Sequence, residues 1–328
     1  MELIQDGLLS ANIDTIRSVF KMEYLSMQIL GAFICTAQNR TADAERLREC
    51  RKIMKSRHGV FSDFRGHLQL PLVVKMSLER DPEGYLDGLG EAYRTLSQGY
   101  KLGHESRLMA ALLLYDNTET ASLPALCERT RELYTLIRKS HPFLTDQSDM
   151  PFAALIALQG GDAEARLEDT EACYQVLKSR FPLSKNAAQT VSHVLAMSSA
   201  PAEEKSARFI ALYDAFKANK LRLPDYYMTV LAVLTNSDIS VEEATRQTRE
   251  HEAALRQMKG FHGLFGIGAE SRRMFAAATT ALNNIPEDAA VEGAVMSTVL
   301  SVIISIEIAI MMMIIINSIN TSTAAASS

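Results

Sequence analysis

The amino-acid sequence predicts an all-α protein, arranged as an α-solenoid-like array of helical hairpins with a long apolar C-terminal helix. Three observations predict it. Glycine and proline are scarce, at 16 and 9 of 328 residues, which favours helices over strands and turns. Amphipathic segments recur from the beginning of the chain to its end, and strongly apolar segments alternate with more polar ones. A hydrophobic content of 47% is enough to bury a sizeable core.

The strongly apolar segments are expected to form inner helices, because their apolar residues lie on most faces. They cover residues 24–36, 68–78, 107–115, 151–158, 190–197, 226–234 and 273–282.

The alternating, more polar segments are expected to form outer helices. Each has a stripe of apolar residues at helical spacing, as Leu126, Leu133 and Ile137 illustrate. They cover residues 42–57, 82–100, 123–139, 164–180, 202–219 and 241–258.

Capping signals support these boundaries. Asp81 precedes Pro82, and Asp149 stands two residues before Pro151, so each places a carboxylate beside a proline in a first turn. Ser240 and Glu243 have the spacing of a capping box, in which each side chain binds the other residue's amide.

The apolar segments recur roughly every 40 residues, the length of a helix-pair repeat. One stretch occurs twice: residues 103–109 (Gly-His-Glu-Ser-Arg-Leu-Met) and 268–274 (Gly-Ala-Glu-Ser-Arg-Arg-Met) both open an apolar helix. The similarity is either a coincidence of common residues or the sign of an array of related hairpins. We favour the array, because the alternation of inner and outer helices also holds elsewhere.

The chain is expected to divide into a helical repeat-like domain (residues 1–285), an apolar C-terminal helix (286–319) and a flexible polar tail (320–328). Residues 294–316 carry one charge, Glu307, and as a helix would span a bilayer core. No basic residue or aromatic belt flanks this segment. Membrane attachment and packing within the array or an oligomer interface both remain open.

Composition and motifs exclude several classes of function. The net charge of -5 argues against nucleic acid as a partner. The sequence has no phosphate-binding loop, zinc-protease motif or nucleophile elbow, so we predict no cofactor and no metal. The four cysteines form no paired motif, and the N-terminus lacks a signal peptide. A reducing, cytoplasmic setting is expected, with membrane association through residues 294–316 left open.

Polar residues beside apolar segments are the candidate ligand-binding residues, and no catalytic residue can be named. Gln189 and His193 lie four residues apart on one helix face and either bind a ligand or satisfy neighbouring backbone groups. The remaining candidates lie in loops that lead into inner helices, where they either bind a ligand or tie and cap the turns. They are Arg65, His67, His141 and Asp149.

Six short stretches carry a resemblance to a known family: residues 59–66, 141–145, 153–158, 189–195, 259–261 and 272–277. In these stretches the chain resembles an uncharacterised bacterial family, domain of unknown function 4003, typical of Firmicutes. The resemblance spans most of residues 15–285 and departs from the family at the glycines of residues 266–268 and in the Met- and Ile-rich tail. It implies a helical fold and a cytoplasmic bacterial setting, and it supplies no activity.

These features lead to three functional hypotheses. The first is a helical-repeat scaffold that binds a protein or peptide along a curved surface. The second is a small-molecule sensor or enzyme with a pocket at the repeat loops, although catalysis is the less favoured reading. The third, compatible with both, is attachment to a membrane through the C-terminal helix. A homo-oligomer formed through that helix is also left open.

Overall fold

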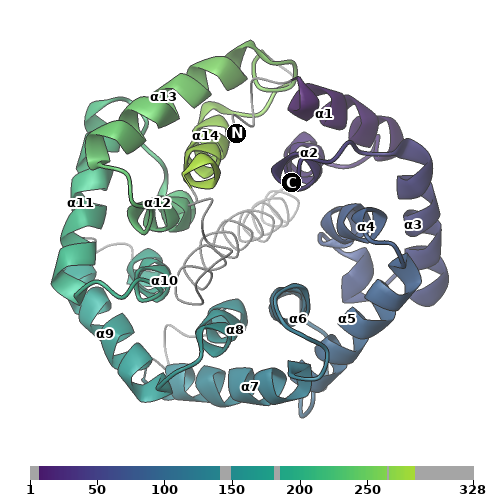
Figure 1. Cartoon of the computed structure of the whole chain (residues 1–328), viewed down its shortest axis with the longest axis horizontal. Coiled ribbons are helices and arrows are strands. Elements are labelled where there is room, and N and C mark those ends of the chain that lie inside the picture. Colours follow the sequence, from purple (N-terminus) through teal and green to yellow (C-terminus); the bar gives the residue numbers. More distant parts are fainter. Residues whose placement is uncertain (1–6, 141–148, 181–184, 264–265, 285–328) are drawn as a thin grey trace, which may run out of the picture.

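The computed structural model describes residues 7–140, 149–180, 185–263 and 266–284 of the chain. Within these ranges the protein is all-α, with fourteen α-helices, two short 3-10 helices and no strand. Seven helices form an outer ring (Figure 1): α1 (Leu8–Val19), α3 (Ala44–Arg57), α5 (Pro82–Leu96), α7 (Leu123–Ser140), α9 (Ala163–Arg180), α11 (Ala202–Ala218) and α13 (Val241–Gln257). Seven form an inner ring: α2 (Leu25–Ala37), α4 (Gln69–Leu78), α6 (Glu105–Asp116), α8 (Met150–Gln159), α10 (Lys185–Leu195), α12 (Met228–Thr235) and α14 (Ala269–Asn283).

Each outer helix packs against the inner helix that follows it in the chain. The inner helices are seen end-on in Figure 1, and the hairpins follow one another around the ring in chain order. The positions of the helices agree with the sequence-predicted segments to within a few residues. α1 is the exception, because residues 8–19 contain no apolar segment strong enough to predict a helix.

The first and last hairpins meet and close the ring. The rings of Phe33 in α2 and Phe275 in α14 stack with their centroids 4.8 Å apart. Nearby, Lys259 Nζ lies 3.8 Å from Asp14 Oδ1. A solenoid-like array would keep its two ends apart, so the predicted solenoid-like arrangement is not confirmed. The hairpins therefore form a closed ring and not an open curved array.

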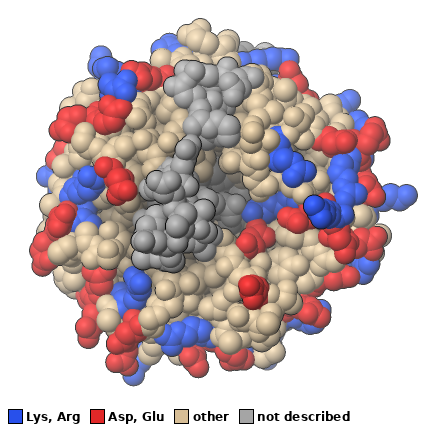
Figure 2. All heavy atoms as spheres, viewed as in Figure 1, with Lys and Arg blue, Asp and Glu red and all other residues tan. Residues whose placement is uncertain are grey.

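The inner helices are apolar because they are buried on all faces. Every residue from Met150 to Ala157 of α8, and every residue of α12, is buried. The outer helices carry most of the charge, and Figure 2 shows Lys, Arg, Asp and Glu gathered mainly toward the edge of the ring. Dispersion and hydrophobic burial between the two rings therefore hold the fold together.

The repeated stretch found in the sequence opens two inner helices, α6 and α14. Its arginine is buried in both places: Arg107 donates to Leu102 O, and Arg272 donates to Phe261 O at 2.7 Å. Each guanidinium thus binds a carbonyl of the connection that precedes its helix. The two stretches occupy equivalent places, although Arg107 Nε donates to the Ser97 hydroxyl and Arg272 Nε to the Glu252 carboxylate.

The predicted caps are partly confirmed. Asp81 Oδ1 accepts a hydrogen bond from Gly84 N at 3.0 Å. Asp149 stands at the N-cap position of α8, but its side chain makes no capping hydrogen bond, so that prediction was wrong. Ser240 Oγ accepts from Glu243 N at 3.1 Å, whereas the Glu243 carboxylate binds Arg246 and Gln247. The capping box is therefore only half formed.

The ring has two faces with different connections. Outer-to-inner connections run to as many as eleven residues and lead into the inner-helix N-termini; this end is the long-loop face. Inner-to-outer connections have at most six residues and form the short-loop face. The described long connections are residues 20–24, 58–68, 97–104, 149, 219–227, 258–263 and 266–268. The short ones are residues 38–43, 79–81, 117–122, 160–162, 196–201 and 236–240.

The predicted C-terminal helix (286–319) and polar tail (320–328) lie outside the described residues. Among the described helices, none is both long enough and apolar enough to cross a bilayer.

Candidate functional site

The long-loop face carries most of the exposed apolar side chains of the described chain. The described residues include seven large apolar side chains that are exposed. Six of them belong to the long connections: Met22, Tyr24, Val60, Phe61, Leu102 and Tyr226. The seventh, Leu136, lies near the end of α7. Isolated exposed apolar residues are common on proteins, but their gathering on one face is typical of an interaction surface.

Phe61 is the most exposed of these side chains, with a relative exposure of 103%, and Met22 follows with 96%. Phe61, Met22 and Leu102 belong to three successive connections. Hydrogen bonds tie the connection of Phe61 to the start of α6, which follows the connection of Leu102. We call the five side chains of these three connections the apolar tips: Met22, Tyr24, Val60, Phe61 and Leu102.

The connection 58–68 holds Phe61 outward by burying the aromatic ring three residues later. Phe64 is buried, its ring stacks on His58 at 4.0 Å, and it meets the edge of Tyr93 at 5.6 Å. Arg65 Nη1 donates to His58 O at 3.3 Å and closes the loop on itself. Burial lowers the pKa of His58, which favours a neutral imidazole in this stack.

The same connection is tied to the start of α6. The Tyr93 hydroxyl donates to Asp63 Oδ2, and its oxygen accepts from His104 N at 3.2 Å. Glu105 Oε1 accepts from His67 N at 2.7 Å. Burial, followed by the bond to Asp63, raises the pKa of Tyr93. These bonds hold the connection of Phe61 against the start of α6, so Val60, Phe61 and Leu102 extend from connections that are held in place.

The two faces also differ in charge. The described long connections carry six basic and four acidic residues: Lys21, Arg65, Lys101, Lys220, Arg222 and Lys259 against Glu23, Asp63, Asp149 and Asp225. The short connections carry two basic and six acidic residues: Arg40 and Arg80 against Asp43, Glu79, Asp81, Glu119, Asp162 and Asp238. The long-loop face is therefore basic relative to the short-loop face, in a chain whose net charge is -5.

Helix capping explains part of the difference in charge between the two faces, but it does not explain the basic residues of the long connections. Asp43 and Asp81 cap outer helices, so some of the acidity of the short-loop face has a structural cause. The long connections lead into the positive ends of the inner-helix dipoles, where cations are unfavourable. Lys21, Lys101 and Lys220 are nevertheless exposed there.

The sequence-predicted ligand residues fall into separate parts of the ring. Arg65 and His67 share the connection before α4. Asp149 begins α8, and Gln189 and His193 lie buried on α10. His141 lies outside the described residues. The common pocket proposed for these side chains stays a prediction.

His193 packs as a core residue. Its ring stacks on Phe152 of α8, with centroids 5.3 Å apart, and it is only 4% exposed. Arg65 is half-buried, and its Nε–H makes no hydrogen bond within the described residues. That nitrogen is itself buried, whereas His67 in the same connection is exposed.

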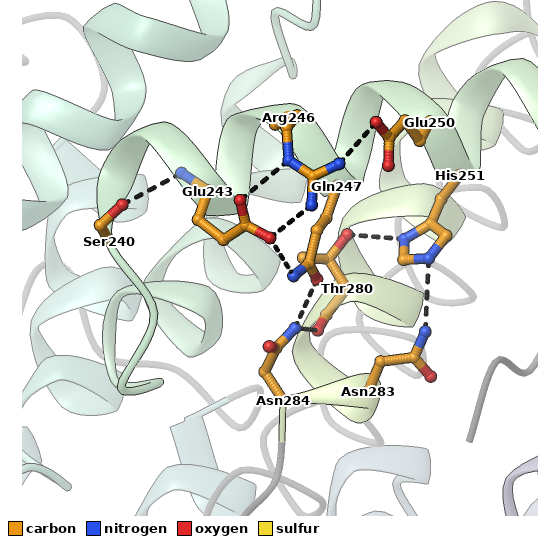
Figure 3. A network of polar contacts seen from close by, with 9 residues as sticks. All are labelled: Ser240, Glu243, Arg246, Gln247, Glu250, His251, Thr280, Asn283 and Asn284. Atoms are coloured by element: carbon orange, nitrogen blue, oxygen red, sulfur yellow. Dashed lines mark hydrogen bonds and ion pairs between the residues drawn. The ribbon is translucent and has the colours of Figure 1, made fainter.

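A polar network lies between α13 and the end of α14 (Figure 3). His251 Nδ1 lies 2.9 Å from Thr280 Oγ1, and its Nε2 lies 3.3 Å from Asn283 Nδ2. Asn284 Nδ2 donates to Gln247 Oε1 and to Thr280 O, both at 2.7 Å. These groups bind one another and fasten the end of α14, so we interpret the network as structural.

Sequence reasoning missed the apolar tips. A sequence signal for them exists, because Val60, Phe61 and Leu102 are apolar residues inside connections. The ionisable residues of the same connections are the more usual indicators of a ligand site. Among the described residues, no cluster of three His, Cys, Asp or Glu side chains is arranged to hold a metal ion.

Comparison with known proteins gives a family without an assigned activity. The family described as "Protein of unknown function (DUF4003)" matches residues 12–310. The "Uncharacterized protein YeaA" of Bacillus subtilis (strain 168) is 25% identical over 221 residues. That match covers 65% of this chain and 65% of the relative, so the chain spans slightly less than two thirds of that protein. No solved structure matches the chain.

Proposed function

We propose, from the premise that the chain belongs to the family of proteins of unknown function DUF4003, that it is a protein- or peptide-binding scaffold whose long-loop face contacts the partner. The single observation that carries the proposal is the gathering of exposed apolar side chains on that face. A cytoplasmic setting and the description of the hairpins as a helical repeat are parts of the same proposal. The equivalent places of Arg107 and Arg272, each bound to a carbonyl of the preceding connection, support the repeat description.

The energetics favour binding at the apolar tips. A few large side chains at the centre of an interface supply most of the binding energy, and aromatic residues are prominent among them. Phe61 and Tyr24 are aromatic, and Met22 and Leu102 add apolar area. Because the loop of Phe61 is already held by the Phe64 stack and by Arg65, little conformational entropy is lost on binding.

Electrostatics adds a preference for an acidic partner. Lys21 and Lys101 flank the apolar tips and are exposed. Charges at the edge of an interface mainly accelerate association and exclude partners of like charge. The scaffold is therefore expected to bind partners that combine apolar side chains with negative charge, faster at low than at high salt.

A photo-crosslinking side chain at position 61 tests the proposal. Benzoylphenylalanine replaces Phe61 in one version of the full chain and Lys52, exposed in the middle of α3, in a matched control. Both are irradiated in the bacterium that makes the protein. Adducts with a second polypeptide are expected at position 61 and not at 52. Equal yields at the two positions, or no adduct at 61, would contradict the proposal.

A small-molecule site is the second candidate, and the observation that favours it is the buried Arg65 Nε–H, which has no hydrogen-bond partner within the described residues. A guanidinium near the start of α4 could bind a carboxylate or phosphate. The test is a thermal-shift screen with anionic metabolites. A ligand of this site raises the melting temperature of the wild type and not that of Arg65→Met. If no compound separates the two proteins, this candidate fails.

Membrane attachment or oligomerisation through residues 294–316 stays a prediction from the sequence, since the segment lies outside the described residues. Fractionation of cells that make the full chain, beside a chain ending at Asn284, tests the membrane hypothesis. Equal recovery of both chains in the soluble fraction would rule it out.

A further inference from the structure

We propose that the partner of the long-loop face is a second copy of this chain, bound through its short-loop face. This inference rests on the proposed function and names its partner. It predicts rings that stack head to tail. Three features of the described residues support it: opposite charge on the two faces, the direction of the helix dipoles, and a recess on the short-loop face that fits an apolar tip.

Charge complementarity favours contact between unlike faces. In the described residues, the long connections carry six basic and four acidic residues, and the short connections carry two basic and six acidic ones. Lys101 beside Leu102 exemplifies the first, and Asp162 beside Gly161 the second. Contact between two like faces would set like charges against each other, which is costly. Head-to-tail stacking is therefore favoured over a symmetric pair of rings.

The directions of the helix dipoles also favour head-to-tail stacking. The inner helices begin on the long-loop face and end on the short-loop face. In a head-to-tail stack, the positive N-termini of one inner ring face the negative C-termini of the next. A symmetric pair would bring helix ends of the same sign together.

The short-loop face has a recess between the starts of α7 and α9. It has a volume of about 670 Å³ and is walled mainly by small or apolar residues, among them Ala125, Leu126, Ala157, Gly160 and Gly161. Arg129 Nη2 donates to Gly161 O at 3.1 Å and supports one wall. The recess is shallow and wide open to solvent, so it suits contact with a side chain of another chain more than enclosure of a small molecule. Phe61, fully exposed on the opposite face, is a projecting side chain that such a recess can receive.

Stacking of this kind is heterologous, because each ring uses two different surfaces. Such contacts do not close on themselves, and they lengthen into a series of oligomers as concentration rises. The two surfaces can also be disabled separately. Phe61→Ser removes the tip, and Ala125→Arg fills the recess with a bulky cation. Both positions are exposed, and Arg is a good helix former, so both variants are expected to fold.

Sedimentation of the purified full-length chain at low salt is the test. The wild type should form dimers and longer oligomers as concentration rises, and added salt should dissociate them. Each single variant should associate at least about tenfold more weakly than the wild type, which is the usual effect of losing a central interface residue. An equal mixture of Phe61→Ser and Ala125→Arg should restore dimers and nothing longer, because only one tip and one recess remain intact. Lys52→Glu, on the side of α3, is the control that should behave as the wild type.

Other outcomes overturn the inference. A wild type that stays monomeric at every concentration would contradict it, and so would a mixture that restores nothing. If the monomeric wild type instead sediments with vesicles of anionic lipid, and Phe61→Ser does not, the occupant is a membrane surface. If position 61 crosslinks to a different polypeptide while the chain stays monomeric, the second copy is excluded and the proposed function stands. If neither crosslinks nor oligomers form, both proposals fail.

Discussion

The two faces of the ring differ in their exposed apolar side chains and not in how arginines hold their connections. On the short-loop face, Arg208 donates to Thr235 O at 2.8 Å, Ser237 O at 2.7 Å and Ile239 O. Arg46 and Arg166 make similar bonds to other connections. On the long-loop face, Arg65, Arg107 and Arg272 likewise donate to connection carbonyls, but large apolar side chains such as Phe61 and Met22 also extend into solvent there.

The difference separates structural residues from interacting ones. A side chain whose donors are bound to backbone carbonyls stabilises the ring, and its removal should lower the free energy of unfolding. An exposed side chain such as Phe61 contributes little to that free energy, so its removal should affect binding alone. Stability and binding measurements on matched variants can therefore test whether bound and exposed side chains have these separate roles.

The largest effect on stability is expected at the contact that closes the ring. Phe275 is fully buried and stacks on Phe33. Phe275→Ala should lower the free energy of unfolding by about 3–5 kcal/mol, through lost burial and the cavity that remains. Urea denaturation measures the change. Phe61→Ala is the matched control and should stay within about 0.5 kcal/mol of the wild type. Equal effects would show that the ring is not closed by this contact.

A smaller loss of stability is expected on the short-loop face. Arg208→Met removes the donors to three carbonyls, and hydrogen bonds from a charged group make the loss about 2–3 kcal/mol. Arg222→Met, an exposed arginine of a long connection, is the control and should be nearly neutral. Chemical denaturation of the two variants compares the faces directly. If Arg222→Met destabilised the protein as much as Arg208→Met, the proposed division of roles would be wrong.

Thiol labelling compares the buried core with the exposed tips. Burial raises the pKa of Cys35 to about 12, and that of Cys50, Cys127 and Cys173 to about 11. Because the thiolate is the reactive form, the native chain should react very slowly with Ellman's reagent at pH 8. Val60→Cys, on the long-loop face, should react at once. Native cysteines that react as fast as Cys at position 60 would show that the core opens readily.

The smallest effect concerns pH and the start of α13. Hydrogen bonds from Arg246, and then Gln247, lower the pKa of Glu243 to about 2. A carboxylate with a lowered folded-state pKa contributes stability above its unfolded pKa, near 4.5, and loses it as pH falls toward 2. The group is exposed, so Glu243→Gln should destabilise slightly at pH 7 and not at pH 2. Thermal melts at both values measure this, and an effect independent of pH would contradict it.

Much of the fold could be predicted from the sequence, because inner and outer helices have different patterns. A helix buried on all faces, such as α8, is apolar throughout, whereas an outer helix such as α7 shows a stripe. Ring closure could not be predicted. It depends on the contact between Phe33 and Phe275, which lie near opposite ends of the described chain and leave no local signal.

The candidate site was only partly predictable, because contacts between residues distant in the sequence decide which side chains are exposed. Composition pointed to the connection that contains Arg65 and His67, and that connection does carry the most exposed tip. It could not show that Phe61 is exposed while Phe64 is buried, since both are aromatic residues of one loop. The packing against Tyr93, from a different helix, decides which ring is buried.

The central claim is that the long-loop face is covered by a partner in the cell, and oxidative footprinting tests it most directly. Met22 and Phe61 are almost fully exposed in the isolated chain, and exposed side chains oxidise readily. Hydroxyl-radical labelling should therefore modify both residues more slowly in concentrated native extract than in dilute purified protein. Peptides from the middle of α3, around Lys52, should be labelled equally in the two samples. Equal labelling of Met22 and Phe61 in both samples would contradict the account.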